Sequence, residues 1–170
     1  MTVCVNAVKY RRMDEREYYI EQHRQMHRVS KRFRGHSLIK HIPDIEQLMR
    51  EKDCHTLLDY GCGKAAHWPQ HWQVTGYDPA YEPYSAKPPG RYHMVICTDV
   101  MEHIPESHTA QVLAEIFGYA ERWVYLSICT RQSDKRMPDG TSVHVNVKPQ
   151  QWWQQLLEQY DRYTAVYTWA

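Results

Sequence analysis

The chain has 170 residues, of which 42% are hydrophobic and 24% charged, and its formal net charge at pH 7 is +1. This length suits one layered domain over residues 1–170. The near-neutral charge argues against a strong nucleic-acid binder, and no apolar run is long enough for a membrane span. Five cysteines without a Cys-x-x-Cys pair favour reduced thiols. The first residues do not match a secretory signal, so we expect a cytoplasmic protein.

The first 52 residues differ in character from the rest, and we predict a charged helical arm there. Apolar side chains recur at helical spacing in this arm: Tyr19, Met26, Val29 and Phe33. Pro43 and Asp44 open a second predicted helix. His23 and His27 stand four residues apart, as a metal-binding pair could. Without a third ligand nearby, we expect them to be surface or capping histidines.

Strands and helices alternate after residue 52, which predicts an α/β core over residues 53–170. The predicted strands lie near residues 56–60, 73–77, 94–98, 122–128, 142–147 and 162–168. The predicted helices span about residues 64–71, 106–121 and 149–160. Four prolines interrupt the 15 residues between Asp78 and Met94. We therefore expect an irregular loop at that point, with no room for a complete further strand and its helices.

The most informative stretch is Leu57-Leu58-Asp59-Tyr60-Gly61-Cys62-Gly63-Lys64, at the end of the first predicted strand. Glycine lacks a β-carbon, so Gly61 and Gly63 would let a ligand reach main-chain N–H groups at the start of the next helix. About 19 residues after Asp59, the second predicted strand ends in Asp78. A carboxylate at that position accepts hydrogen bonds from ribose hydroxyls. Together these features predict a site for a nucleoside cofactor.

These residues resemble the class I S-adenosylmethionine-dependent methyltransferases. The glycine-rich motif of that family is an acid followed by three alternating glycines, and Asp59, Gly61 and Gly63 match it, whereas Ala65 replaces the third glycine. Dinucleotide-binding dehydrogenases would require a glycine where Ala66 stands. The resemblance covers about residues 54–130, and the short, tryptophan-rich chain looks most like the compact methyltransferases of tailed bacteriophages.

The resemblance implies a Rossmann-like sheet with helices on both faces, a truncated third-strand region and S-adenosylmethionine as the cofactor. The implied cofactor-binding residues follow the first, second and fourth strands of the family: Asp59, Tyr60, Gly61, Cys62, Gly63, Asp78, Pro79, Thr98 and Asp99. In related folds the arm before the first strand closes over the cofactor or shapes the acceptor pocket. Arg34, Gly35, His36 and Lys40 are therefore expected to border the site, and Arg34 and Lys40 are candidates for the methionine carboxylate.

The loop Asp99-Val100-Met101-Glu102-His103-Ile104-Pro105 is the next chemical feature. Glu-His at this place also occurs in ubiquinone-type and small-RNA 2′-O-methyltransferases, which add a later histidine to hold a divalent metal. Glu102, His103 and His144 could hold Mg, Mn or Zn in that way. Alternatively, Glu102 and His103 begin the following helix, and His103 or His144 is a general base.

We therefore predict a methyltransferase whose acceptor is a small molecule, a nucleotide or a nucleic-acid group, located in the cytoplasm, or in the host cytoplasm if the chain is phage-encoded. Ten basic against four acidic residues from Lys9 to His41 could steer phosphates, although they more often form a solvated helix face. One alternative is an enzyme that cleaves S-adenosylmethionine or moves its aminocarboxypropyl group, and another is a non-catalytic binding protein of the same fold.

Overall fold

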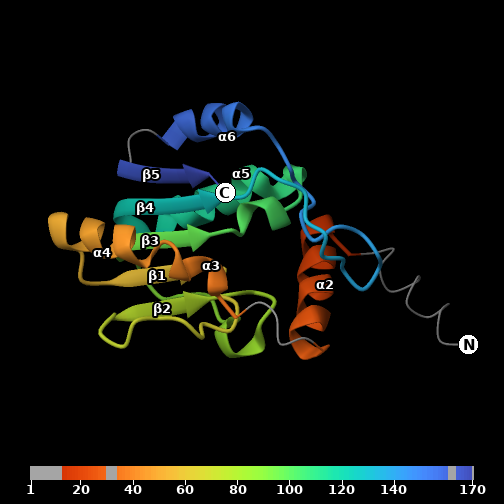
Figure 1. The fold of residues 1–170 in the computed structure, drawn as a ribbon, viewed down its shortest axis with the longest axis horizontal. Helices are drawn as coiled ribbons and strands as arrows, with labels where there is room; N and C mark the ends of the chain where they lie inside the picture. The colour runs from red at the N-terminus through yellow and green to blue at the C-terminus, as the bar shows by residue number, and fades with distance from the viewer. Residues whose placement is uncertain (1–12, 30–33, 161–163, 170) are drawn as a thin grey trace, which may run out of the picture.

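A computed structural model describes residues 13–29, 34–160 and 164–169 (Figure 1). Its centre is a parallel five-stranded sheet with the strand order β2-β1-β3-β4-β5. The strands are β1 (Leu57–Tyr60), β2 (Val74–Tyr77), β3 (Tyr92–Thr98), β4 (Ala120–Ile128) and β5 (Thr164–Trp169). Five of the six predicted strands are thereby confirmed, with small differences in their bounds.

Helices cover both faces of the sheet, as the Rossmann-like prediction requires (Figure 1). The helices against the sheet are α3 (His36–Ile39), α4 (Ile42–Glu51), α5 (Glu106–Tyr119) and α6 (Gln150–Leu157), and α6 continues into the 3-10 helix η3 (Glu158–Tyr160). The predicted helices at 106–121 and 149–160 and the one opened by Pro43 and Asp44 are confirmed. None of the helices in the described part of the chain combines the length and apolar composition that crossing a membrane requires.

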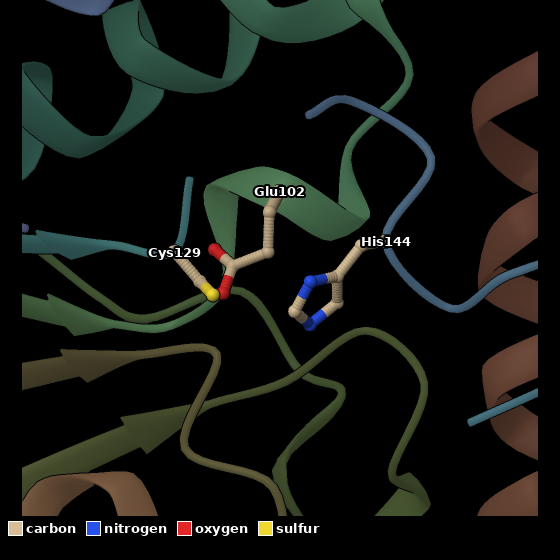
Figure 2. Close-up of side chains that lie close together, drawn as sticks. All are labelled: Glu102, Cys129 and His144. Atoms are coloured by element: carbon tan, nitrogen blue, oxygen red, sulfur yellow. The ribbon is translucent and has the colours of Figure 1, made fainter. Parts of the chain in front are cut away.

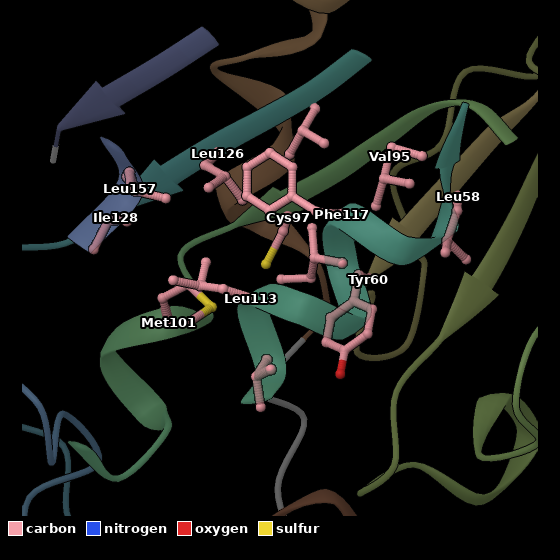
Figure 3. Packing of buried hydrophobic residues seen from close by; sticks show 14 of the residues in the cluster. Leu58, Tyr60, Val95, Cys97, Met101, Leu113, Phe117, Leu126, Ile128 and Leu157 are labelled. Carbon is pink, nitrogen blue, oxygen red and sulfur yellow. The ribbon is translucent and has the colours of Figure 1, made fainter. Parts of the chain in front are cut away.

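Successive side chains along each strand point to opposite faces of the sheet, so each face has its own set of packed residues. Met94 and Ile96 of β3 pack with residues of α3 and α4, whereas Val95 and Cys97 pack with α5 and α6 in the cluster of Figure 3. All four side chains are fully buried. Because both faces of β3 are covered, its sequence is continuously apolar from 94 to 97 and shows no polar alternation.

The predicted helix at 64–71 is wrong, because residues 61–72 contain turns and no helix. Pro69 lacks the N–H that a helix interior needs. The Ala66 N–H donates to the Arg34 carbonyl at 3.1 Å, and the Trp68 indole N–H donates to the Asp59 carboxylate at 2.8 Å. These bonds to distant residues hold the Ala66 N–H and the Trp68 side chain in positions that a helix would not give them.

The predicted strand at 142–147 is also wrong, since only an isolated bridge between Arg136 and Ser142 lies nearby. The N–H groups of Val145 and Asn146 donate to the Glu102 carbonyl at 2.9 and 3.1 Å. This segment therefore packs beside the loop after β3 and does not join the sheet. Between β2 and β3 there is no strand, only the 3-10 helix η1 (Glu82–Tyr84), which confirms the truncated third-strand region.

Helix α2 (Glu15–Val29) lies across the carboxyl ends of the strands (Figure 1). It contains Tyr19, Met26 and Val29 of the predicted arm helix, whereas Phe33 is outside the described residues. The Arg16 guanidinium donates two hydrogen bonds to the Glu115 carboxylate on α5, at 2.8 and 2.9 Å. The Tyr60 hydroxyl on β1 donates to the same carboxylate at 2.7 Å. One partly buried carboxylate thus connects α2, α5 and β1.

We expect Glu115→Gln to destabilise the fold by about 1–3 kcal/mol at pH 7, because a charge-assisted pair is lost. Burial by itself would raise the pKa of Glu115, but the hydrogen bonds from Arg16 and Tyr60 hold it below its usual value of 4.5. The stability that Glu115 contributes is present above pH 4.5 and is lost as the pH falls through the lower pKa of the folded state. Denaturant unfolding of both proteins from pH 3 to pH 7 measures this difference.

The exposed Glu158 is the matched control, and Glu158→Gln should leave the free energy of unfolding unchanged. If Glu115→Gln were as stable as the original chain at pH 7, α2 would not be anchored through this carboxylate.

Candidate active site

A pocket opens at the carboxyl ends of β1, β2 and β3, and α2 forms its opposite wall. The empty space between its walls, including the part that is open to solvent, is about 880 Å³. Seven of the nine predicted cofactor-binding residues line it: Tyr60, Gly61, Gly63, Asp78, Pro79, Thr98 and Asp99. Pockets at this edge of open α/β sheets are the usual ligand sites of such folds.

The glycine turn after β1 is folded tightly against β2 and β3. Gly61 and Gly63 have φ values of 81° and 57°, in the region that favours glycine. A β-carbon on Gly61 would lie 2.4 Å from a methyl carbon of Val100, so the turn and the loop after β3 could not approach as they do. The N–H groups of Gly61 and Cys62 both donate to the Tyr77 carbonyl, at 2.6 and 3.2 Å. The expectation of N–H groups at a helix start is wrong, because no helix follows and these amides bind β2.

Asp78 is the acid that follows β2, and its carboxylate faces the pocket. It accepts hydrogen bonds from the N–H groups of Gly63 at 2.9 Å and Ala80 at 2.8 Å. His27 Nε2 lies 3.9 Å from the same carboxylate. Burial raises the pKa of Asp78 and lowers that of His27. A carboxylate has about four lone-pair directions, so Asp78 retains the capacity to accept hydrogen bonds from a ligand.

Asp59 and Cys62, the other two predicted cofactor-binding residues, are not part of the pocket wall. The Asp59 carboxylate is buried and accepts the Trp68 indole N–H. Burial raises the pKa of Asp59 to about 7, and the hydrogen bond from Trp68 offsets part of this effect. Cys62 is buried beside Gly76, where an added β-carbon would lie 2.9 Å from Sγ. Both residues support the glycine turn from inside the protein, on the side away from the pocket.

The loop after β3 begins at Asp99, which has φ of 54° and lines the pocket. Its carboxylate accepts hydrogen bonds from the Ser127 hydroxyl at 2.7 Å and from Lys40 Nζ at 3.3 Å. Gly35 and Ser37 line the pocket as well, whereas Arg34, His36 and Lys40, the other arm residues expected to border the site, are not part of its lining. The Arg34 side chain is exposed, and its carbonyl binds the turn through Ala66.

The histidines of α2 lie in the pocket wall, so the expectation of surface histidines is wrong. His23 is half-buried and its ring lies 5.1 Å from the ring of His103, while His27 is buried. Burial, followed by the influence of His27 and His144, lowers the pKa of His23 to about 4. Burial also lowers the pKa of His103 well below its usual value. The His23 and His103 rings are therefore neutral at pH 7.

The three residues predicted for catalysis or metal binding lie close together, but only one of them lines the pocket. His103 lines the pocket, and its Nδ1 is 2.7 Å from the Val143 carbonyl. Glu102 and His144 lie behind His103, with the His103 and His144 rings 5.0 Å apart. Burial raises the pKa of Glu102 to about 8, partly offset by the backbone N–H groups of Glu102 and Cys129. Glu102 and His103 form the single-turn helix η2 (Met101–His103).

Sequence reasoning missed that Arg16, Tyr19 and Ile20 line the pocket beside His23 and His27. These positions recur at intervals of three and four residues, which is one face of a helix. That pattern could have grouped them, but only the fold shows that this face turns toward the strands. The four cysteines of the described part of the chain, Cys54, Cys62, Cys97 and Cys129, are not paired in disulfides.

Comparison with known proteins identifies the family. A family model described as a methyltransferase domain matches residues 23–165, which is most of the chain. The chain therefore belongs to the class I S-adenosylmethionine-dependent methyltransferases, and S-adenosylmethionine is the cofactor that this membership implies. No curated protein and no solved structure matches the chain.

We expect Asp59→Asn to stabilise the chain at alkaline pH, because asparagine can still accept the Trp68 hydrogen bond but cannot ionise. The folded-state pKa near 7 exceeds the usual value of 3.8. Stability that depends on protonated Asp59 is complete below pH 3.8 and is lost as the pH rises through 7. The variant should therefore gain up to about 4 kcal/mol over the original chain between pH 4 and pH 8.

Denaturant unfolding at several pH values measures this gain, with the exposed Asp44→Asn as the control that should show none. A difference between the Asp59→Asn variant and the original chain that stays constant with pH would contradict the buried, proton-binding carboxylate.

Proposed function

We propose that the chain transfers the methyl group of S-adenosylmethionine to a hydroxyl of a small molecule, a nucleotide or a nucleic-acid group. In this proposal Asp78 accepts hydrogen bonds from the ribose hydroxyls. The methionine part lies toward Thr98 and Asp99, and its carboxylate binds Lys40, whose Nζ lies 3.3 Å from the Asp99 carboxylate. The arrangement is supported by the order of these residues along one pocket, from the end of β2 to the end of β3.

The observation that carries the hydroxyl acceptor is the pair of neutral histidines in the pocket wall. His103 Nδ1 is within hydrogen-bond distance of the Val143 carbonyl, a group that can only accept, so Nδ1 carries the proton. In the neutral ring, Nε2 then carries the lone pair. A hydroxyl nucleophile must lose its proton during methyl transfer, and the Nε2 lone pair of His103 can accept it. The lowered pKa of this buried ring makes it a weak base, so it acts while the sulfonium charge is being neutralised and does not form a stable imidazolium beforehand. His23, 5.1 Å away between ring centres, forms the adjoining wall.

Methyl transfer requires little covalent help, since the sulfonium methyl is already electrophilic and in-line alignment supplies much of the acceleration. The pocket contributes alignment: the strand ends hold the donor, and α2 limits the directions from which an acceptor can approach. A divalent metal on Glu102, His103 and His144 is the alternative means of activating the hydroxyl. His103 is not one of the three residues whose ligand atoms lie within 4.8 Å of one another, which favours the base over the ligand role for this ring.

Two other functions of this fold make different products. Cleavage of S-adenosylmethionine or aminocarboxypropyl transfer yields methylthioadenosine, methyl transfer yields S-adenosylhomocysteine, and a binding protein yields neither. Incubation of the full chain with S-adenosylmethionine and pooled hydroxyl acceptors, followed by mass spectrometry, separates the three. We expect S-adenosylhomocysteine. Methylthioadenosine as the product, or no product despite tight cofactor binding, would contradict the proposal.

Cofactor binding is tested by calorimetry with S-adenosylhomocysteine. Asp78→Asn should weaken binding roughly 10- to 100-fold, because hydrogen bonds to a charged acceptor are lost. Asp44→Asn, which changes an exposed aspartate on α4, should bind as the original chain does. Equal affinity of the Asp78→Asn variant and the original chain would remove Asp78 from the cofactor site. Circular dichroism should confirm that both variants are folded.

A further inference from the structure

A second chemical cluster lies behind the pocket wall, where three elements of the chain meet (Figure 2). It consists of Glu102 on η2, Cys129 directly after β4 and His144 in the segment that was expected to be a strand. One ligand atom from each residue lies within 4.8 Å of the other two. Within residues 13–29, 34–160 and 164–169, no other group of three histidine, cysteine or acidic residues comes this close.

Glu102 is the member that requires explanation. Its side chain has 0% exposure. The backbone N–H groups of Glu102 and Cys129 act on the carboxylate, but among the described residues neither of its oxygens accepts a hydrogen bond of ordinary geometry. Figure 2 shows the carboxylate directed toward Cys129. Burying an ionised acid without donors costs several kcal/mol, so such an acid either keeps its proton or is compensated by a positive charge. The two other buried acids at this edge, Asp59 and Asp78, do have donors.

The other two ligands are oriented by a shared backbone group. His144 Nδ1 lies 2.7 Å from the Arg131 carbonyl, and the Cys129 thiol lies 3.8 Å from the same oxygen. When Nδ1 donates its proton to a carbonyl, the lone pair of the neutral ring is on Nε2. Metal-binding histidines usually have this arrangement, with one ring nitrogen donating to a carbonyl or carboxylate and the other binding the ion. The N–H groups of Val145 and Asn146 bind the Glu102 carbonyl and fix this segment to η2.

We propose that Glu102, Cys129 and His144 bind a zinc-class divalent cation. A thiolate and an imidazole favour zinc over magnesium or calcium, which prefer oxygen ligands. The carboxylate and the thiolate together balance the two positive charges of the ion, and both the thiol and the protonated carboxyl release their protons to solvent on binding. Three protein ligands leave one coordination position for water or another group. This set differs from the one expected from the sequence, since Cys129 takes the place of His103.

The ion would connect the end of β4 and the segment around His144 to the turn that carries His103. It would thereby hold the base of the proposed reaction in the pocket wall without contacting the cofactor. The metal site does not depend on the proposed function, because the cluster and its buried carboxylate are present whatever the acceptor is.

The test uses the full chain, stripped with a chelator and then loaded with cobalt(II) as a spectroscopic substitute for zinc. A cobalt–thiolate bond gives a charge-transfer absorption in the near ultraviolet that cobalt on surface histidines or carboxylates does not give. We expect this band to saturate at about one cobalt per chain and to disappear when zinc is added, as for a single site that both ions occupy. The zinc content after dialysis should likewise be about one per chain.

Cys129→Ser should abolish the band and lower the zinc affinity at least 10-fold, whereas Cys54→Ser, a change in the cluster on the other face of the sheet, should keep both. Glu102→Gln serves if Cys129→Ser does not fold; it should keep the thiolate band but weaken zinc binding by a similar factor. Absence of the band in the original chain, or its persistence in Cys129→Ser, would overturn the proposal. S-adenosylhomocysteine calorimetry on the same stripped sample separates this failure from failure of the proposed function.

Discussion

The position of α2 across the carboxyl ends of the strands is the constraint on which the site depends. Without that helix, the ends of β1, β2 and β3 would form an open edge, and the pocket would lose the side chains of Tyr19, His23 and His27. Contacts near both ends hold the helix. Arg16 binds the Glu115 carboxylate at one end, and Met26 packs against Met137 and Val143 near the other. The polar anchor connects α2 to the core, whereas the apolar anchor connects it to the loop after β4.

The carboxyl edge of the sheet holds three buried acids, and each is accommodated differently. Asp59 has the Trp68 indole as a donor, and Asp78 has two backbone amides. Glu102 has no comparable donor. The first acid shapes the glycine turn, the second faces the pocket, and the third lies beside a thiol and an imidazole. Their different surroundings give these acids different chemical capacities, although the sequence presents all three simply as acids after apolar strands.

The sequence was sufficient where local patterns decide the structure. Continuous apolar runs predicted the central strands, and the prolines between Asp78 and Met94 predicted the missing third strand. It was insufficient where distant groups compete with local propensity. The segment at 64–71 binds Asp59 and Arg34, and the segment at 142–147 binds Glu102, so neither adopts the predicted element.

The same distinction applies to the site. Asp78 and Asp99 could be predicted because each directly follows a strand, and strand ends of a parallel sheet meet at one edge. The pocket position of His23 could not be predicted, since it depends on where α2 lies. Cys129 could not be connected with Glu102 either, because the two residues meet only through the pairing of β3 with β4.

Hydrogen–deuterium exchange of the full chain with and without S-adenosylhomocysteine tests the central claim most directly, because it reports on α2 and on the strand ends in one experiment. If α2 closes a cofactor pocket, the ligand should slow exchange in residues 15–29 as well as in 61–63 and 78–80, and leave α4 unchanged. Protection confined to the strand ends, with α2 exchanging as in the ligand-free chain, would contradict the account.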